Sequence, residues 1–154
     1  MKNSNLPFLI LTIVSAITMS CSKTPSTFPD GGERADKIYI LIDDQLVKAH
    51  EYVLNVAGSE GFTDLDIVSY GLTNVEILGS NADFSIEEMF RLPEYGSVLF
   101  KKAESADYDQ YKQVVRIKYK ANPSGKVRSA VVRFHAEGFN GFLSDIIVKQ
   151  GPQS

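Results

Sequence analysis

The chain has 154 residues, of which 44% are hydrophobic and 23% are charged, and its formal net charge is −3. This composition is ordinary for a globular domain and excludes a wholly disordered chain. A mildly acidic chain without a run of Lys and Arg lacks the positive surface that nucleic-acid binding requires, so we exclude that class of function.

The N-terminus has the pattern of a secretion signal. Lys2 precedes an almost unbroken apolar run from 6 to 19, which ends just before Cys21. A run of about 14 residues suits a signal peptide but is too short for a membrane-spanning helix, which needs about 20. Cys21 is the only cysteine of the chain, so it cannot form an internal disulfide. Its position therefore indicates a different role.

The segment around Cys21 resembles the lipobox of bacterial lipoproteins. Ser20 and Cys21 match its small residue and its lipidated cysteine, and the loose match at Thr18 and Met19 resembles lipoproteins of the Bacteroidetes. The resemblance implies acyl chains on Cys21 that hold the protein to a membrane without a spanning helix. It also implies an outer-membrane lipoprotein, on the periplasmic face or at the cell surface. The alternative is an ordinary cleaved signal in which Cys21 has no role.

The next segment, residues 22–36, has the composition of a linker. It is rich in Ser, Thr, Pro and Gly, and Phe28 is its one large apolar residue. Such a segment is extended and solvated rather than packed. The sequence therefore predicts three parts: a lipoprotein signal peptide over 1–21, a flexible linker over 22–36, and one folded domain over 37–154.

From Lys37 onward, apolar residues alternate with polar ones, which indicates β-strands rather than helices. About eight short strands separated by turns predict an all-β sandwich or barrel. The alternating segments are 38–42, 52–56, 65–67, 75–77, 98–100, 115–119, 130–135 and 146–148.

Two connections carry more specific predictions. Residues 122–125 (Asn-Pro-Ser-Gly) fit a tight turn, because proline suits its second position and glycine its fourth. This turn predicts a hairpin between the strands on either side. Ser85 and Glu88 have the spacing of a helix cap, and Met89, Phe90 and Leu92 follow, so we expect a single helical turn there.

The C-terminal third resembles BACON-type domains. In that family an Asn precedes a turn, an Arg opens an alternating strand, and a final strand ends in Val-x-Gln; Asn122, Arg128, Val148 and Gln150 fit these positions. BACON-type domains are immunoglobulin-like sandwiches of Bacteroidetes cell-envelope lipoproteins and glycan-degrading enzymes. The resemblance therefore implies an immunoglobulin-like β-sandwich of about seven to eight strands.

No catalytic constellation is evident in the sequence. His50 and His135 are far apart in the chain, and neither a nucleophile elbow nor a phosphate-binding loop is present. We therefore predict that the protein is not an enzyme and holds no metal and no cofactor. Three acidic pairs lack the remainder of a calcium-loop signature and are interpreted as solvated carboxylates. They are Asp43 with Asp44, Asp64 with Asp66, and Asp107 with Asp109.

Aromatic residues in two connections are the candidate ligand-binding groups. Loops at the ends of a sandwich commonly carry binding surfaces, and aromatic rings beside polar groups could stack on sugars or contact a protein. The alternative for Phe139 or Phe142 is that the ring covers the open end of the core. The predicted ligand-binding residues are Tyr108, Tyr111, Phe139, Asn140 and Phe142.

These features together predict a non-catalytic cell-envelope binding module, anchored to a membrane by lipid and recognising glycans through loop aromatics. The alternative is a structural or accessory envelope lipoprotein that acts through protein–protein contacts.

Overall fold

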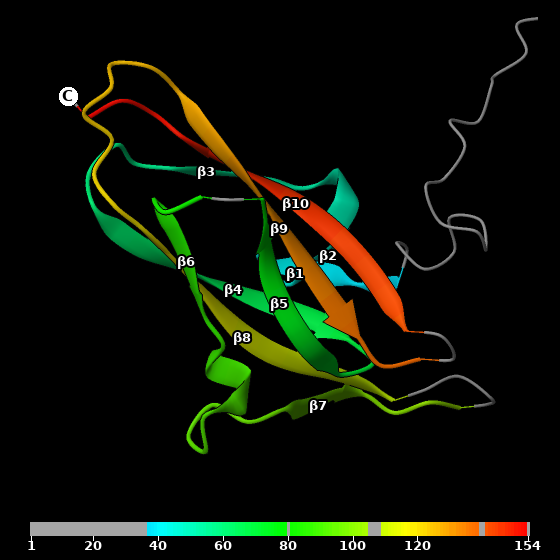
Figure 1. Cartoon of the computed structure of the whole chain (residues 1–154). Coiled ribbons are helices and arrows are strands. Elements are labelled where there is room, and N and C mark those ends of the chain that lie inside the picture. The colour runs from blue at the N-terminus through cyan, green and yellow to red at the C-terminus, as the bar shows by residue number, and fades with distance from the viewer. Residues whose placement is uncertain (1–36, 80, 105–108, 139–140, 154) are drawn as a thin grey trace, which may run out of the picture.

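The computed structural model describes residues 37–79, 81–104, 109–138 and 141–153. The signal peptide, Cys21 and the linker lie outside these ranges, as do Asp107, Tyr108, Phe139 and Asn140. In the described part, no helix is long and apolar enough to cross a membrane. The domain is a β-sandwich of two sheets, as predicted (Figure 1).

The described residues form ten strands and two short 3-10 turns. In chain order they are β1 (Tyr39–Ile42), β2 (Gln45–Lys48), η2 (Ala49–Glu51), β3 (Val53–Val56), β4 (Gly61–Ser69), β5 (Leu72–Leu78), β6 (Phe84–Glu87), η3 (Met89–Arg91), β7 (Val98–Lys101), β8 (Gln110–Tyr119), β9 (Arg128–Ala136) and β10 (Phe142–Gln150).

The strands form a six-stranded and a four-stranded sheet. The six-stranded sheet has the order β2-β1-β4-β8-β6, and β7 also pairs with β8. The four-stranded sheet has the order β3-β10-β9-β5. Only the pairing of β3 with β10 is parallel among the pairings described. β8 therefore pairs with three other strands, β4 on one edge and β6 and β7 on the other.

The core lies between the two sheets and is built from the alternating residues that the sequence predicts. In β8, Val115 and Ile117 are fully buried, whereas Arg116 between them points outward. In β9, Val132 and Phe134 face the core in the same way. This period of two gives each strand one apolar face, and burying that face against the opposite sheet stabilises the sandwich.

The predicted hairpin at residues 122–125 is wrong. The turn is present, with Gly125 at a φ of 68°, but β8 and β9 belong to different sheets. The connection is held by backbone bonds of Asn122, whose N–H donates to the Gly58 carbonyl at 2.8 Å and whose carbonyl accepts from the Gln153 N–H at 2.8 Å. Alternation predicts that a strand has a buried face, but it does not predict which strand becomes its partner.

The predicted helical turn is displaced along the chain. Ser85 lies in β6, opposite Lys118, rather than at a helix cap, and a single 3-10 turn forms at Met89–Arg91. The sequence also did not predict β2. Asp43 and Asp44 join β1 to β2 in a two-residue turn with φ values of 48° and 61°, a conformation that aspartate tolerates.

Candidate functional site

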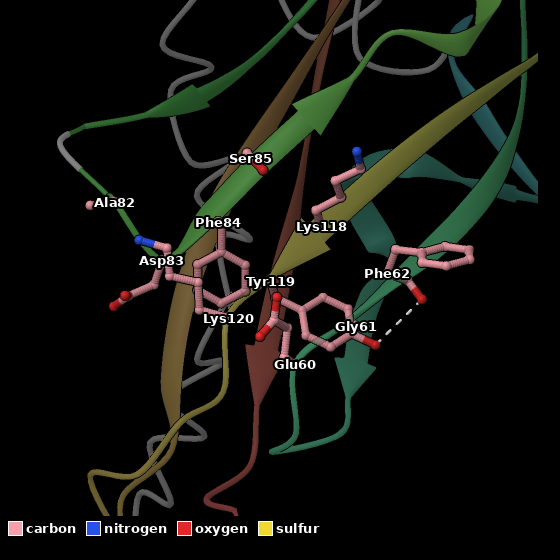
Figure 2. A pocket seen from close by; sticks show the side chains of 10 residues that line it. All are labelled: Glu60, Gly61, Phe62, Ala82, Asp83, Phe84, Ser85, Lys118, Tyr119 and Lys120. Atoms are coloured by element: carbon pink, nitrogen blue, oxygen red, sulfur yellow. Dashed lines mark hydrogen bonds between the residues drawn. The ribbon is translucent and has the colours of Figure 1, made fainter.

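An open pocket lies at one end of the six-stranded sheet, where β8 ends and where β4 and β6 begin (Figure 2). Its volume is about 370 Å³, within the usual range for small-molecule sites. Gly61 of β4 and Phe84 of β6 both pair with Tyr119 at the end of β8. Side chains from three strands therefore meet here because each strand starts or stops at the same level.

The apolar floor of the pocket consists of buried aromatic residues. Phe84 is 4% and Tyr119 is 9% exposed. The Tyr119 hydroxyl lies 3.5 Å from the Phe62 carbonyl oxygen, to which it donates. A Cβ at Gly61 would lie 3.2 Å from the Tyr119 hydroxyl oxygen, so glycine at this position lets the ring lie against the β4 backbone. The floor is thus fixed by packing.

Phe62 also lines the pocket, but its ring lies on the outer face of the sheet, turned away from the Tyr119 and Phe84 rings (Figure 2). Its side chain is 55% exposed, and the Arg116 guanidinium lies 3.9 Å from its ring centroid. Arg116 also donates to both carboxylate oxygens of Asp64, at 2.7 and 2.8 Å. These hydrogen bonds hold the pKa of Asp64 below its ordinary value and raise the pKa of Arg116. The pair therefore holds one side of the Phe62 ring in place.

The polar groups of the lining fall into two classes. Lys118 forms an ion pair with Glu87 at 2.7 Å, and Asp83 forms one with Arg128 at 3.0 Å. The Glu60 carboxylate and the Lys120 ammonium, by contrast, have no partner within the described ranges. The lining also includes Ser85, whose hydroxyl can donate or accept. The Glu60 carboxylate, the Lys120 ammonium and the Ser85 hydroxyl can therefore bond to a ligand.

A network of side-chain hydrogen bonds supports the pocket from behind. Gln150 is fully buried; its amide nitrogen donates to the carbonyls of Ala57 and Lys120, each at 2.9 Å, and its oxygen accepts from Arg128 at 2.7 Å. Arg128 in turn reaches Asp83 in the pocket lining. Asn122 belongs to the same region and donates to the Lys126 and Gly151 carbonyls at 2.7 and 2.9 Å. Gln150 and Asn122 thus donate to backbone carbonyls and hold the ends of the neighbouring loops in place.

Two of the residues predicted to bind a ligand, Tyr111 and Phe142, are among the described residues. Both lie at the end of the sandwich opposite the pocket. Tyr111 is half-buried near the start of β8, opposite Ser69 of β4. Phe142 begins β10 and packs on Tyr70, with ring centroids 5.2 Å apart. A Cβ at Gly138 would lie 2.1 Å from the Phe142 ring. Phe142 therefore covers the end of the core, which is the alternative that the sequence left open.

Several of the acidic residues and histidines considered from the sequence contact other groups, whereas Asp107 lies outside the described residues. Asp66 pairs with Lys112 at 3.2 Å, and Asp109 accepts from the Ala103 N–H at 2.8 Å. His135 lies 2.8 Å from a Glu76 oxygen on the outer face of the four-stranded sheet. Throughout the described ranges, no group of three His, Cys, Asp or Glu side chains is placed to hold a metal ion.

The alternation in the sequence does not predict the pocket. The predicted third strand begins at residue 65, which leaves Phe62 outside it. The useful signal was the order of residues 62, 64 and 66, where an aromatic and two aspartates share one face with period two. An aromatic ring on the polar face of a strand indicates an exposed ring, because the other face supplies the core.

Comparison with known proteins adds little to this description. No protein-family model matches the chain, and no curated protein matches it. One solved structure with a similar fold is a Bacteroides ovatus GH5 xyloglucanase in complex with a XXXG heptasaccharide (18% identity, TM-score 0.44, 76% of this chain and 19% of that chain). Another is a nucleoside hydrolase-related protein from Saccharophagus degradans, described as associated with carbohydrate metabolism (11% identity, TM-score 0.38, 76% and 26%). This chain thus spans about a fifth to a quarter of each.

Proposed function

We propose that this protein is a non-catalytic binding module of the cell envelope and that it binds glycans in the pocket between β4, β6 and β8. The observation that carries the proposal is an open pocket at the ends of β4, β6 and β8 whose lining includes the exposed Phe62 and two polar side chains, Glu60 and Lys120, without a partner among the described residues. Sites for small ligands combine an apolar lining with a few polar groups that set orientation. A sugar offers matching chemistry, because C–H groups cover its ring faces and hydroxyl groups its edge.

Each group in the pocket has a distinct role in this proposal. The exposed Phe62 ring packs against a sugar face, and Arg116 fixes the orientation of that ring from its other side. The Glu60 carboxylate accepts hydrogen bonds from sugar hydroxyls, and the Lys120 ammonium donates to them. Tyr119 and Phe84, buried on the core face of the same strands, hold the backbone of the pocket in place.

The cellular setting of the proposal rests on the sequence. A signal core ends at Cys21, and a linker separates it from β1. We propose that acyl chains on Cys21 anchor the protein in the outer membrane and that the linker lets the domain stand away from the lipid. The resemblance to BACON-type domains of Bacteroidetes envelope proteins supports the same setting. Tyr108, Tyr111, Phe139, Asn140 and Phe142 stay predictions for a second contact surface.

The test is a glycan-binding measurement on the chain from residue 22 onward, first on an array and then by calorimetry with the best ligand. Phe62→Ala should weaken binding at least about tenfold, because the ring supplies the main contact. The matched control is Leu46→Ala, an exposed apolar residue of β2 on another part of the sheet. Tyr111→Ala tests the opposite end of the sandwich.

The outcomes separate the alternatives. Binding that is lost with Phe62→Ala but kept in both other variants supports the pocket. Binding that depends on Tyr111 instead would move the site to the other end of the sandwich. A folded chain that binds no glycan on the array contradicts the proposal and favours an accessory role through protein contacts.

A further inference from the structure

β5 is the longest strand at an edge of the sandwich. It ends the four-stranded sheet and has seven residues, whereas the other edge strands described, β2, β3, β6 and β7, have four residues each. A long edge presents backbone donors and acceptors to which another chain can add a strand. Short edge strands limit this risk by their length, so β5 requires a different form of protection.

The outer edge of β5 bonds to two side chains, and no strand of the described part of the chain covers it. The Val75 N–H donates to Glu88 Oε1 at 3.3 Å, and Arg91 Nη2 donates to the Thr73 carbonyl. Arg91 Nη1 also forms an ion pair with Glu88 Oε2 at 2.8 Å. The two side chains and the backbone from Thr73 to Val75 therefore form a closed ring of polar contacts. We refer to the Glu88–Arg91 pair as the edge guard.

The contacts of the edge guard match those of one residue in an added parallel strand. In a parallel pair, the carbonyl of one residue and the N–H two positions further along bond to the same residue of the neighbouring strand. The edge guard supplies the same two groups, a donor for the Thr73 carbonyl and an acceptor for the Val75 N–H. It therefore occupies backbone groups that an incoming strand would need.

The 3-10 turn η3 holds the edge guard in position. Glu88 and Arg91 are three residues apart, and side chains with this spacing align in a 3-10 turn. Between them, Met89 and Phe90 are both buried. The Arg91 guanidinium also lies 5.4 Å from the Phe90 ring centroid. The edge guard is thus attached to buried residues, which keep it beside β5.

We propose that the edge guard is a built-in block against strand addition, and that it prevents β5 from pairing with β5 of a second copy of the chain. Every copy carries the same seven-residue edge, so a second copy is the partner that the block must exclude first. The proposal is independent of glycan binding, because neither Glu88 nor Arg91 lines the pocket.

The decisive variant is Glu88→Ala with Arg91→Ala, which removes both bonds to β5 and leaves the net charge unchanged. We use the chain from residue 22 onward, which contains every described residue, at a concentration where it is monomeric. Hydrogen exchange at the Val75 amide should become roughly tenfold faster in this variant, whereas the amides of β9 should not change. Glu88→Gln keeps an acceptor for the Val75 N–H, so its exchange should stay close to that of the wild type.

Loss of the edge guard should also make the chain associate. In sedimentation velocity, the double variant should form dimers or larger species at concentrations at least about tenfold below those at which the wild type forms any. The matched control is Asp66→Ala with Lys112→Ala, which removes an ion pair between the inner strands β4 and β8 of the other sheet. Equal association of this control would attribute the effect to the loss of an ion pair and overturn the proposal.

Cross-linking tests whether the association involves β5. The chain from residue 22 onward has no cysteine, and Asn74 is an exposed residue of β5, so Asn74→Cys adds a single thiol at the guarded edge. A short bismaleimide should couple two copies when the edge guard is removed but not when it is present. Val127→Cys is the control for random collision, because Val127 is exposed in the β8–β9 connection.

Three further results would overturn the proposal. The first is unchanged exchange at Val75 in the folded double variant, since the edge guard would then not bond to β5. The second is a double variant that stays monomeric at every concentration although Val75 exchanges faster. The third is cross-linking through Val127→Cys that equals cross-linking through Asn74→Cys. If the double variant does not fold, Glu88→Ala alone removes the acceptor and is judged by the same three results.

Discussion

β6 and β7 pair with the same edge of β8 but have opposite environments. β6 begins with the buried Phe84, and its ring lies 5.4 Å from the Arg128 guanidinium, which also binds Gln150 and Asp83. β7 has no buried residue. Pairing with β8 positions both strands, yet only β6 contributes a side chain to the core between the sheets. The comparison separates a strand that stabilises the domain from one that is available to other molecules.

The sharpest test of this comparison replaces one phenylalanine by alanine in each strand. Phe84→Ala should lower the free energy of unfolding by about 3 kcal/mol, because it leaves a cavity in the core. Phe100→Ala in β7 should change it by less than about 0.5 kcal/mol, since that ring is exposed. Urea unfolding measures both values. Equal losses in the two variants would show that β7 supports the fold as much as β6 does.

A second prediction concerns the network behind β6. Gln150→Ala should lower the free energy of unfolding by about 2 kcal/mol, because it removes a fully buried side chain that donates to the Ala57 carbonyl and accepts from Arg128. The control is Gln153→Ala, because Gln153 is exposed and lies beyond the end of β10. Unfolding curves that coincide with the wild type for both variants would contradict a supporting role for the network.

A third prediction concerns the floor of the pocket. Gly61→Ala should cost about 1 kcal/mol and weaken glycan binding, because the added methyl group displaces the Tyr119 ring by a few tenths of an ångström. Gly96→Ala is the matched control, since no atom lies within 4 Å of a Cβ there. Thermal melting and calorimetry measure the two effects. If the Gly61→Ala chain is destabilised but binds glycan with full affinity, the Tyr119 floor does not contribute to binding.

The smallest expected effect is a pH dependence. Hydrogen bonds from Arg116 lower the pKa of Asp64 in the folded protein, so this pair stabilises the fold above the ordinary carboxyl pKa of about 3.9. The contribution is lost as the pH falls through the lowered pKa. Asp64→Asn should therefore be less stable than the wild type at pH 7, with a difference that shrinks toward pH 3. Urea midpoints at both values test the sign; a constant difference would contradict it.

Sequence patterns predict the parts of this fold that depend on one strand at a time. The alternation in β8 and β9 identifies their buried faces, and the resemblance at Arg128 and Gln150 marks the ends of two core strands. Pairing is different, because it depends on residues far apart in the chain. The hairpin predicted at residues 122–125 was therefore wrong, and β6, which is short and interrupts its apolar pattern, was interpreted as helical.

The pocket was missed for the same physical reason. It exists only because the ends of β4, β6 and β8 coincide in register, and Phe62, Phe84 and Tyr119 are separated by long stretches of chain. The alternation of Val98 and Phe100 predicts the strand β7. It does not predict that every residue of β7 is exposed, because exposure depends on which other segments cover the strand. Neither property can be inferred from periodicity alone.

The position of β10 has a consequence for how the protein is made. This strand comes last among those described, yet it lies inside the four-stranded sheet, between β3 and β9. That sheet cannot assemble until residues 142–150 have been synthesised, and early segments wait without their partners. Such non-local pairing makes folding slow. β3 therefore has no sheet partner until the last described strand is available, which makes the order of synthesis opposite to the order of pairing in this sheet.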